Sequence, residues 1–97
     1  MTTESKNIQP ENGQNASQND YINFYSTFDL GCSAALICAG FELASLDKTN
    51  PRKVQFIFRR NASIDNAVGD YWDDRLEIKA RSFFDNIKML KNRIYSE

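Results

Sequence analysis

The stretch that decides the fold is Lys53-Val54-Gln55-Phe56-Ile57-Phe58-Arg59. Val54, Phe56 and Phe58 alternate with their neighbours, and this period of two predicts a β-strand with one apolar face. Two interpretations of that face are open. Three apolar side chains in a small domain are typical of a core, whereas exposed rings beside basic residues are typical of sheets that bind single-stranded nucleic acid.

The residues before this strand predict its partner in a hairpin. The run Phe41–Leu46 begins with the same period of two, and Asp47–Arg52 contains the turn signal Asn50-Pro51. We therefore expect two antiparallel strands joined by a longer loop.

Farther toward the N-terminus, the aromatic-rich run Ile22–Phe28 predicts another strand. Thr27 or Asp29 is placed to cap an apolar helix from about Leu30 to Ala39. Gly40 follows where a left-handed residue would end that helix.

Two more helices are expected after the hairpin. The first is capped by Asn61 or Ser63, and its apolar residues have helical spacing; they are Ile64, Ala67, Val68, Tyr71 and Trp72. The second runs from about Ala80 to Ile94. Between the two, Leu76-Glu77-Ile78 is long enough for a short strand.

These elements predict a single small α+β domain with the order β-α-β-β-α-β-α. Three helices would pack on an antiparallel-containing sheet of three or four strands. The domain is expected at residues 21–97. Residues 1–20 are almost entirely polar, so we expect a disordered tail there, because so little apolar surface cannot offset the entropy of ordering.

Composition excludes several function classes. The chain has 97 residues with 12 Lys plus Arg, 13 Asp plus Glu and no His, so catalysis and zinc binding through His are excluded. The four glycines never cluster into a phosphate-binding loop. No apolar run approaches the roughly 20 residues that a membrane span needs. We expect a non-enzymatic protein with no cofactor, no small-molecule substrate and no membrane partner.

Two local clusters have structural interpretations. Cys32 and Cys38 lie six residues apart on the predicted helix, too far around it to share a metal ion. We interpret them as free thiols, which indicates a reducing, cytoplasmic compartment. Asp70, Asp73 and Asp74 are interpreted as a solvated helix end rather than a cation site, because Arg75 is adjacent.

The chain resembles a known family in several segments. They are Asp29 opening an apolar helix, Gly40-Phe41 closing it, the strand Val54–Phe58, and Phe83-Phe84 through Lys88 to Leu90-Lys91. Together they are similar to a family of small prokaryotic and phage proteins known only as a domain of unknown function. The resemblance covers Tyr25 to Tyr95. It implies a bacterial or phage setting and an accessory role, and it supplies no activity, cofactor or catalytic residue.

Charge is unevenly distributed along the chain, with an excess of basic residues in the second half. Our first functional hypothesis is therefore contact with nucleic acid or a nucleoprotein complex through a basic surface. The residues expected to carry it are Arg52, Lys53, Arg59, Arg60, Lys88 and Lys91.

The alternative is a protein–protein interaction module, either a homodimer or an inhibitor or modulator of a larger protein. Aromatic residues dominate the energetics of such interfaces. The side chains expected to provide the anchor are Tyr71, Trp72, Met89 and Tyr95.

Overall fold

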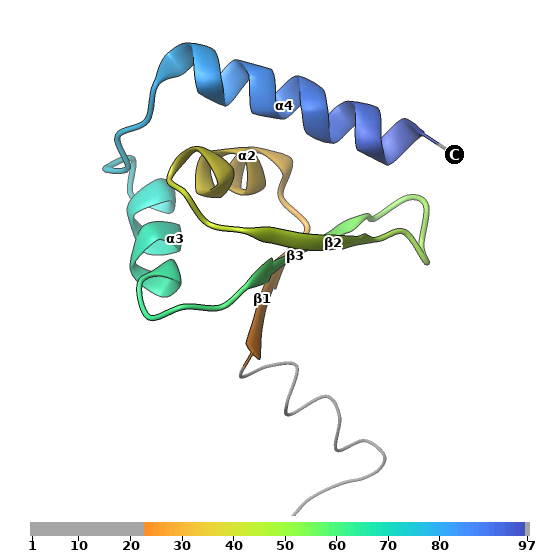
Figure 1. Cartoon of the computed structure of the whole chain (residues 1–97), viewed down its shortest axis with the longest axis horizontal. Helices are drawn as coiled ribbons and strands as arrows, with labels where there is room; N and C mark the ends of the chain where they lie inside the picture. Colours follow the sequence, from red (N-terminus) through yellow and green to blue (C-terminus); the bar gives the residue numbers. More distant parts are fainter. Residues whose placement is uncertain (1–22, 97) are drawn as a thin grey trace, which may run out of the picture.

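The computed structural model describes residues 23–96 and contains three strands and three helices in that range (Figure 1). In chain order they are β1 (Phe24–Thr27), α2 (Leu30–Cys38), β2 (Leu43–Asp47), β3 (Gln55–Arg59), α3 (Ile64–Trp72) and α4 (Ala80–Tyr95). This confirms the α+β class. The predicted tail, residues 1–20, lies outside the described residues.

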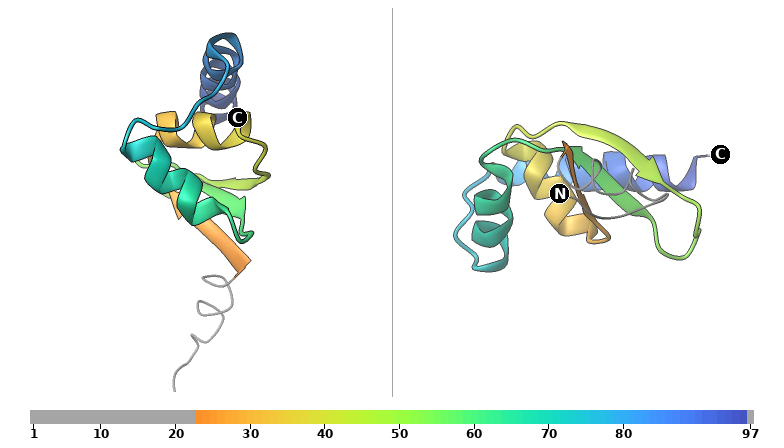
Figure 2. Two further views of the ribbon diagram at one scale, coloured as in Figure 1. Left: turned by 90° about the vertical axis from the view of Figure 1, so that its left-hand side faces the viewer. Right: turned by 90° about the horizontal axis from the view of Figure 1, so that it is seen from below.

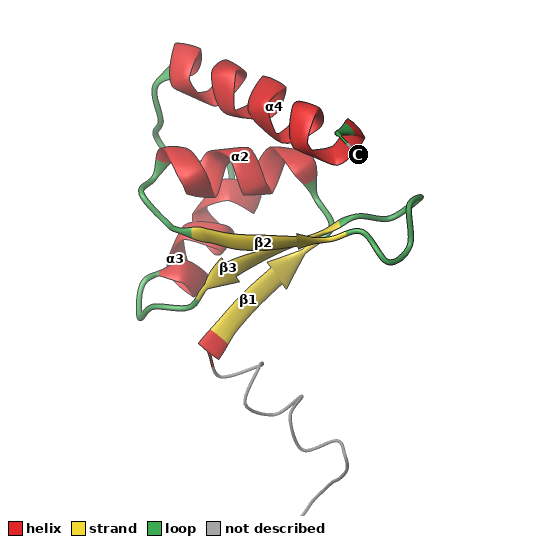
Figure 3. Cartoon of the chain, turned by 45° about the vertical axis from the view of Figure 1, so that its right-hand side comes forward, coloured by secondary structure: helices red, strands yellow, loops and turns green. Residues whose placement is uncertain are grey.

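The sheet has the order β1-β3-β2, and both neighbouring pairs are antiparallel (Figure 3). β1 and β2 are therefore parallel to each other, with β3 inserted between them. The connection β1-α2-β2 is thus a split βαβ unit. β2 and β3 form the predicted hairpin, and a β-bulge interrupts their register between Leu43 and Ser45.

α2 begins and ends where its capping residues predict. Asp29 Oδ1 accepts a hydrogen bond from the backbone N–H of Cys32 (2.7 Å), as an N-cap does. Gly40 has a φ of 101°. Its N–H donates to the Ile37 carbonyl oxygen (3.0 Å), and the N–H of Phe41 donates to the Leu36 carbonyl oxygen (3.0 Å). This pair of bonds is the Schellman motif, so the predicted role of Gly40 is confirmed.

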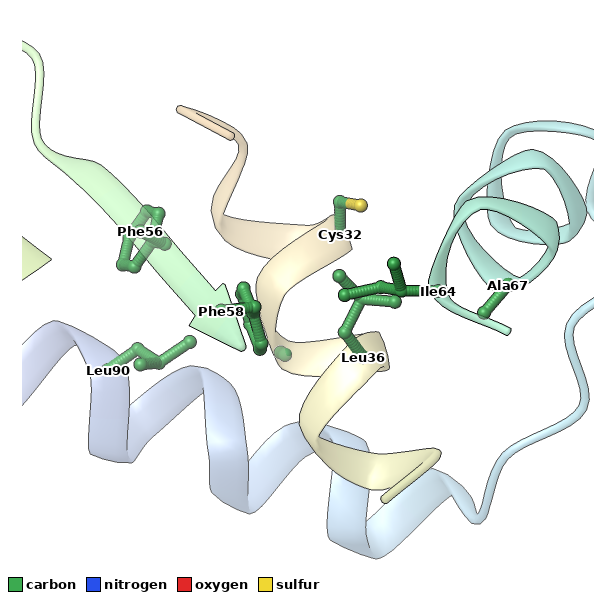
Figure 4. Close-up of a cluster of buried hydrophobic side chains, with 8 residues drawn as sticks. Cys32, Leu36, Phe56, Phe58, Ile64, Ala67 and Leu90 are labelled. Carbon is green, nitrogen blue, oxygen red and sulfur yellow. The ribbon is translucent and has the colours of Figure 1, made fainter. Parts of the chain in front are cut away.

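The molecule is layered, with α4 over α2 and α2 over one face of the sheet (Figures 1 and 2). α3 packs beside α2. Side chains from all of these layers meet in one core (Figure 4). Its buried members are Cys32, Ala34, Leu36, Phe56, Phe58, Ile64, Ala67 and Leu90.

The short strand predicted at Leu76–Ile78 is wrong. Residues 75–79 form an irregular link between α3 and α4. A strand exists only where its backbone pairs with a neighbour, and among residues 23–96 the sheet contains only β1, β3 and β2. Leu76 and Ile78 are half-buried, so their apolar character reflects partial burial rather than pairing.

Lys48, just after β2, fixes the far end of α4. Its Nζ donates to the carbonyl oxygens of Arg93 (2.7 Å) and Ser96 (2.9 Å). A cation that bonds the last carbonyls of a helix interacts favourably with the helix dipole. The hairpin and the outermost helix are joined in this way.

Candidate functional site

The aromatic rings of Phe56 and Phe58 in β3 face the interior of the protein. Phe56 and Phe58 are 1% and 0% exposed and lie beside Leu90 and α2 (Figure 4). The core interpretation is therefore confirmed. The interpretation of these rings as a stacking platform for nucleic acid is wrong, because the helices cover the face that carries them.

Four of the predicted nucleic-acid-binding residues flank β3 at opposite ends. Arg52 and Lys53 lie in the exposed β2–β3 loop, where Lys53 Nζ sits 4.6 Å from the ring centroid of Phe28. Arg59 ends β3, and Arg60 follows it. The length of the strand separates the two basic pairs.

At the C-terminal end of β3, acidic side chains pair with Arg59 and Arg60. Arg59 Nε lies 3.3 Å from Glu42 Oε2, and Arg60 Nη1 lies 2.7 Å from Asp65 Oδ2. These ion pairs reduce the positive potential that Arg59 and Arg60 present to a partner.

The remaining two predicted residues, Lys88 and Lys91, lie on α4. α2 separates the body of α4 from the sheet (Figure 2). The structure therefore distributes the six basic residues over three places and does not bring them into one patch.

The four predicted protein-interface residues are also divided. Trp72 is 59% exposed on α3, and the half-buried Tyr71 ring meets it edge-on with centroids 5.0 Å apart. On α4, Met89 packs partly against the core, and Tyr95 is 81% exposed. The four residues therefore do not form one surface, and the aromatic pair Tyr71 and Trp72 lies on α3.

The face of the sheet opposite the helices is uncovered in the described part of the chain (Figure 2). The register places Phe24 and Ser26 of β1, Gln55, Ile57 and Arg59 of β3, and Ser45 and Asp47 of β2 on this side. We call these seven residues the open sheet face. They line part of a shallow depression of about 790 Å³ that Arg60 and Asp65 border.

Sequence reasoning missed the open sheet face, although it left a signal. Because side chains alternate along a strand, burial of Phe56 and Phe58 means that Gln55, Ile57 and Arg59 point to the opposite face of the sheet. Ile57 is apolar and only half-buried at such a position, directly between Ser26 and Ser45. Phe24, on the same face, is also half-buried, and both side chains line one depression, which makes this face a candidate contact surface.

β1 is an edge strand, and no strand within residues 23–96 pairs with its outer side. The Arg60 N–H donates to the Asn23 carbonyl oxygen (2.9 Å). In an antiparallel pair every second residue bonds to the neighbouring strand, so the N–H and C=O groups of Phe24 and Ser26 point away from β3. β1 contains no charged residue and no proline, the devices that commonly prevent edge pairing. The other edge, β2, carries the bulge.

A buried polar cluster surrounds the first turn of α2, on the covered side. Burial, together with the nearby Asp29 carboxylate, raises the pKa of the Cys32 thiol to about 11, and a hydrogen bond with Tyr25 partly offsets this. Burial also raises the pKa of Tyr25 and of Tyr71. Cys32 is therefore a neutral packing residue and not an activated nucleophile.

Arg75 occupies the acidic end of α3. Its guanidinium lies 3.0 Å from Asp70 and 3.2 Å from Asp73. Within residues 23–96, no group of three His, Cys, Asp or Glu side chains is arranged to hold a metal ion. Over the same range, no helix has both the length and the apolar character needed to cross a membrane.

Comparison with known proteins places the chain in a family. No curated protein and no solved structure matches it significantly. The model of the family described as Domain of unknown function (DUF5659) matches residues 22–96, which include every helix and strand of the structure. The chain therefore belongs to the DUF5659 family.

Proposed function

We propose that this protein is a non-enzymatic binding protein whose open sheet face and β1 edge receive a protein partner. The observation that carries the proposal is the uncovered face itself, with Ile57 at its centre and a depression of about 790 Å³. A segment of the partner would add to β1 as an extended strand. Such strand addition takes affinity from main-chain hydrogen bonds and specificity from side-chain pockets.

The charges around the depression favour a protein over a polyanion. Arg59 and Arg60 are paired with Glu42 and Asp65, and Asp47 also borders the site. A nucleic acid requires an excess of positive charge, whereas a protein interface has an apolar centre and a mixed polar rim.

The side chains of the depression also support a non-enzymatic role. The lining contains no Cys, and the chain has no His that could act as a base for Ser26 or Ser45. Of the two carboxylates, Asp65 is paired with Arg60, and Asp47 accepts hydrogen bonds from Thr49, which lower its pKa. A carboxylate that holds its charge this firmly is a weak general base.

The cellular setting belongs to the same proposal. Free Cys32 and Cys38 support a reducing, cytoplasmic compartment. The resemblance noted above supports a bacterial or phage origin and an accessory role.

Site-specific photo-crosslinking tests the proposed surface. A benzophenone side chain is introduced at Ser26 or at Ser45, both exposed on the open sheet face, and the cells are irradiated. Ser82, an exposed serine of α4, is the matched control. We expect one protein to be crosslinked from both sheet positions and not from Ser82.

The crosslinked protein is then purified, and its affinity is measured by calorimetry. Ile57→Asp should weaken binding at least about tenfold, the equivalent of about 1.4 kcal/mol, with an unchanged circular dichroism spectrum. Ser26→Arg, at an exposed position, provides a second variant. Identical products from Ser82, or full affinity in both variants, would show that the partner binds elsewhere.

A further inference from the structure

Positive charge in the described part of the chain is concentrated on α4. This helix contains four basic residues and one acidic residue, whereas residues 23–79 contain seven basic and eight acidic. α4 is also the outermost layer of the molecule, so its outer side is not covered by any described element (Figure 1). The excess charge is thus carried by one helix, and three of its four basic residues, Arg81, Lys88 and Lys91, lie on the same side of it.

Five residues share that outer side. Their spacing of three or four residues places them in one row on the helix. They are Arg81, Phe84, Lys88, Lys91 and Tyr95, which we call the α4 row. All are exposed, including the two aromatic residues Phe84 (56%) and Tyr95 (81%).

The two lysines of the row carry most of its available charge. Asp85, the single acid of α4, pairs with Arg81 at 3.5 Å. Lys88 Nζ lies 5.4 Å from the ring centroid of Phe84, so a cation already lies against an exposed ring. No acidic residue stands three or four positions from Lys91.

We propose that the α4 row binds single-stranded nucleic acid. Phosphates would contact Lys88, Lys91 and Arg81, and unpaired bases would stack on Phe84 and Tyr95. Those two rings lie about 16 Å apart along the helix axis, with the lysines between them. Cations interleaved with exposed rings are the combination by which proteins hold single strands without reading sequence.

Other anionic partners fit the row less well. An interfacial helix inserts its apolar face into a bilayer, but the apolar face of α4 packs inward through Ile87, Leu90 and Ile94. Lysine is depleted at protein–protein interfaces. A duplex would use the cations but would have no unpaired base to place on the rings.

This site is separate from the open sheet face. α2 lies between the sheet and the body of α4 (Figure 3), so the two surfaces can be tested one at a time. Ile57→Asp, which tests the protein partner, should leave the affinity for nucleic acid unchanged.

Fluorescence anisotropy with labelled oligonucleotides is the test. The full chain is titrated against a thymidine oligonucleotide of about 16 nucleotides and against a duplex of equal length. Salt is varied from about 50 to about 200 mM, and three phosphate contacts predict a roughly 20-fold loss of affinity over this range. We expect binding of the single strand that is tighter than binding of the duplex.

Two double charge reversals with the same net change identify the surface. Lys88→Glu with Lys91→Glu should weaken binding of the single strand at least about tenfold. Arg52→Glu with Lys53→Glu, in the exposed hairpin loop, should change it less than about threefold, because it alters only the long-range field. An equal loss of affinity for the single strand in the two double variants would overturn the proposal.

The exposed rings are tested separately. Phe84→Ala and Tyr95→Ala should each weaken binding of the single strand at least about fivefold, and binding of the duplex much less. Because both side chains are exposed, circular dichroism should show an unchanged fold. Unchanged affinity in both variants, or binding of the duplex as tight as that of the single strand, would overturn the assignment.

Discussion

At the scale of single residues, Gly31 is a position where two effects oppose each other. It lies in α2, where replacement of Gly by Ala normally stabilises a helix by about 1 kcal/mol. However, an added Cβ at Gly31 would lie 2.5 Å from the Tyr71 hydroxyl oxygen. Such an overlap typically costs about 1–3 kcal/mol. We therefore expect Gly31→Ala to lower the free energy of unfolding.

The effect should reverse in a Tyr71→Phe background. Without the hydroxyl, the next ring atom, Tyr71 Cζ, lies at 3.6 Å from the added Cβ, an ordinary contact. Gly31→Ala should then show its helix preference and stabilise the protein. Urea unfolding of the four members of this double-mutant cycle measures the coupling. Additive changes would show that the hydroxyl is not the cause.

At the scale of elements, Lys48 connects the hairpin to α4. Lys48→Met keeps the length of the side chain and removes the donor to the Arg93 and Ser96 carbonyls. We expect the free energy of unfolding to fall by about 1–2 kcal/mol. Arg52→Met removes an equal charge from the neighbouring exposed loop and should cost less than about 0.5 kcal/mol. Equal values in denaturant unfolding would contradict a capping role for Lys48.

Element prediction from the sequence succeeded where local chemistry decides and failed where neighbours decide. Gly40 and the alternation of Phe56 and Phe58 are local signals, and the helix end and the strand that they predict are both confirmed. Leu76–Ile78 has an apolar alternation too short to distinguish a strand from an irregular link. α3 ends at Trp72, and the left-handed position that follows it is Asp74, with a φ of 61°, so no glycine in the sequence marks this helix end.

At the scale of the whole molecule, stability should depend on alkaline pH through the buried cluster at α2. The ordinary pKa of a cysteine thiol is 9.0, and in the folded protein that of Cys32 is about 11. Between these values the unfolded chain loses a proton that the folded protein keeps. Deprotonation then favours the unfolded state, so stability falls as the pH rises from about 9 to about 11. The raised pKa values of Tyr25 and Tyr71 act in the same direction at higher pH.

Denaturant unfolding followed by circular dichroism across this pH range measures the effect. Cys32→Ser carries no group that titrates there, and Asp29 and Tyr25, which face Cys32, remain in place. The variant should therefore lose less stability than the wild type. Parallel profiles would show that Cys32 does not contribute to the loss.

The arrangement of the candidate sites belongs to this scale as well. Each basic residue was visible in the sequence, but whether Arg59 and Lys88 share a surface depends on the layer order. The ion pair of Arg59 with Glu42 joins residues that lie 17 positions apart in the chain, and it depends on the pairing of β3 with β2. The sequence therefore named basic residues but did not show which of them lie on one surface.

The position of β3 between β1 and β2 has a consequence for synthesis of the chain. As the polypeptide leaves the ribosome, β1, α2 and β2 emerge before the strand with which both must pair. When β3 does emerge, its two buried rings still lack Leu90, which is translated later. The nascent chain thus exposes unpaired strand edges and apolar side chains until α4 has been made, an interval in which it is open to misassociation and to capture by chaperones.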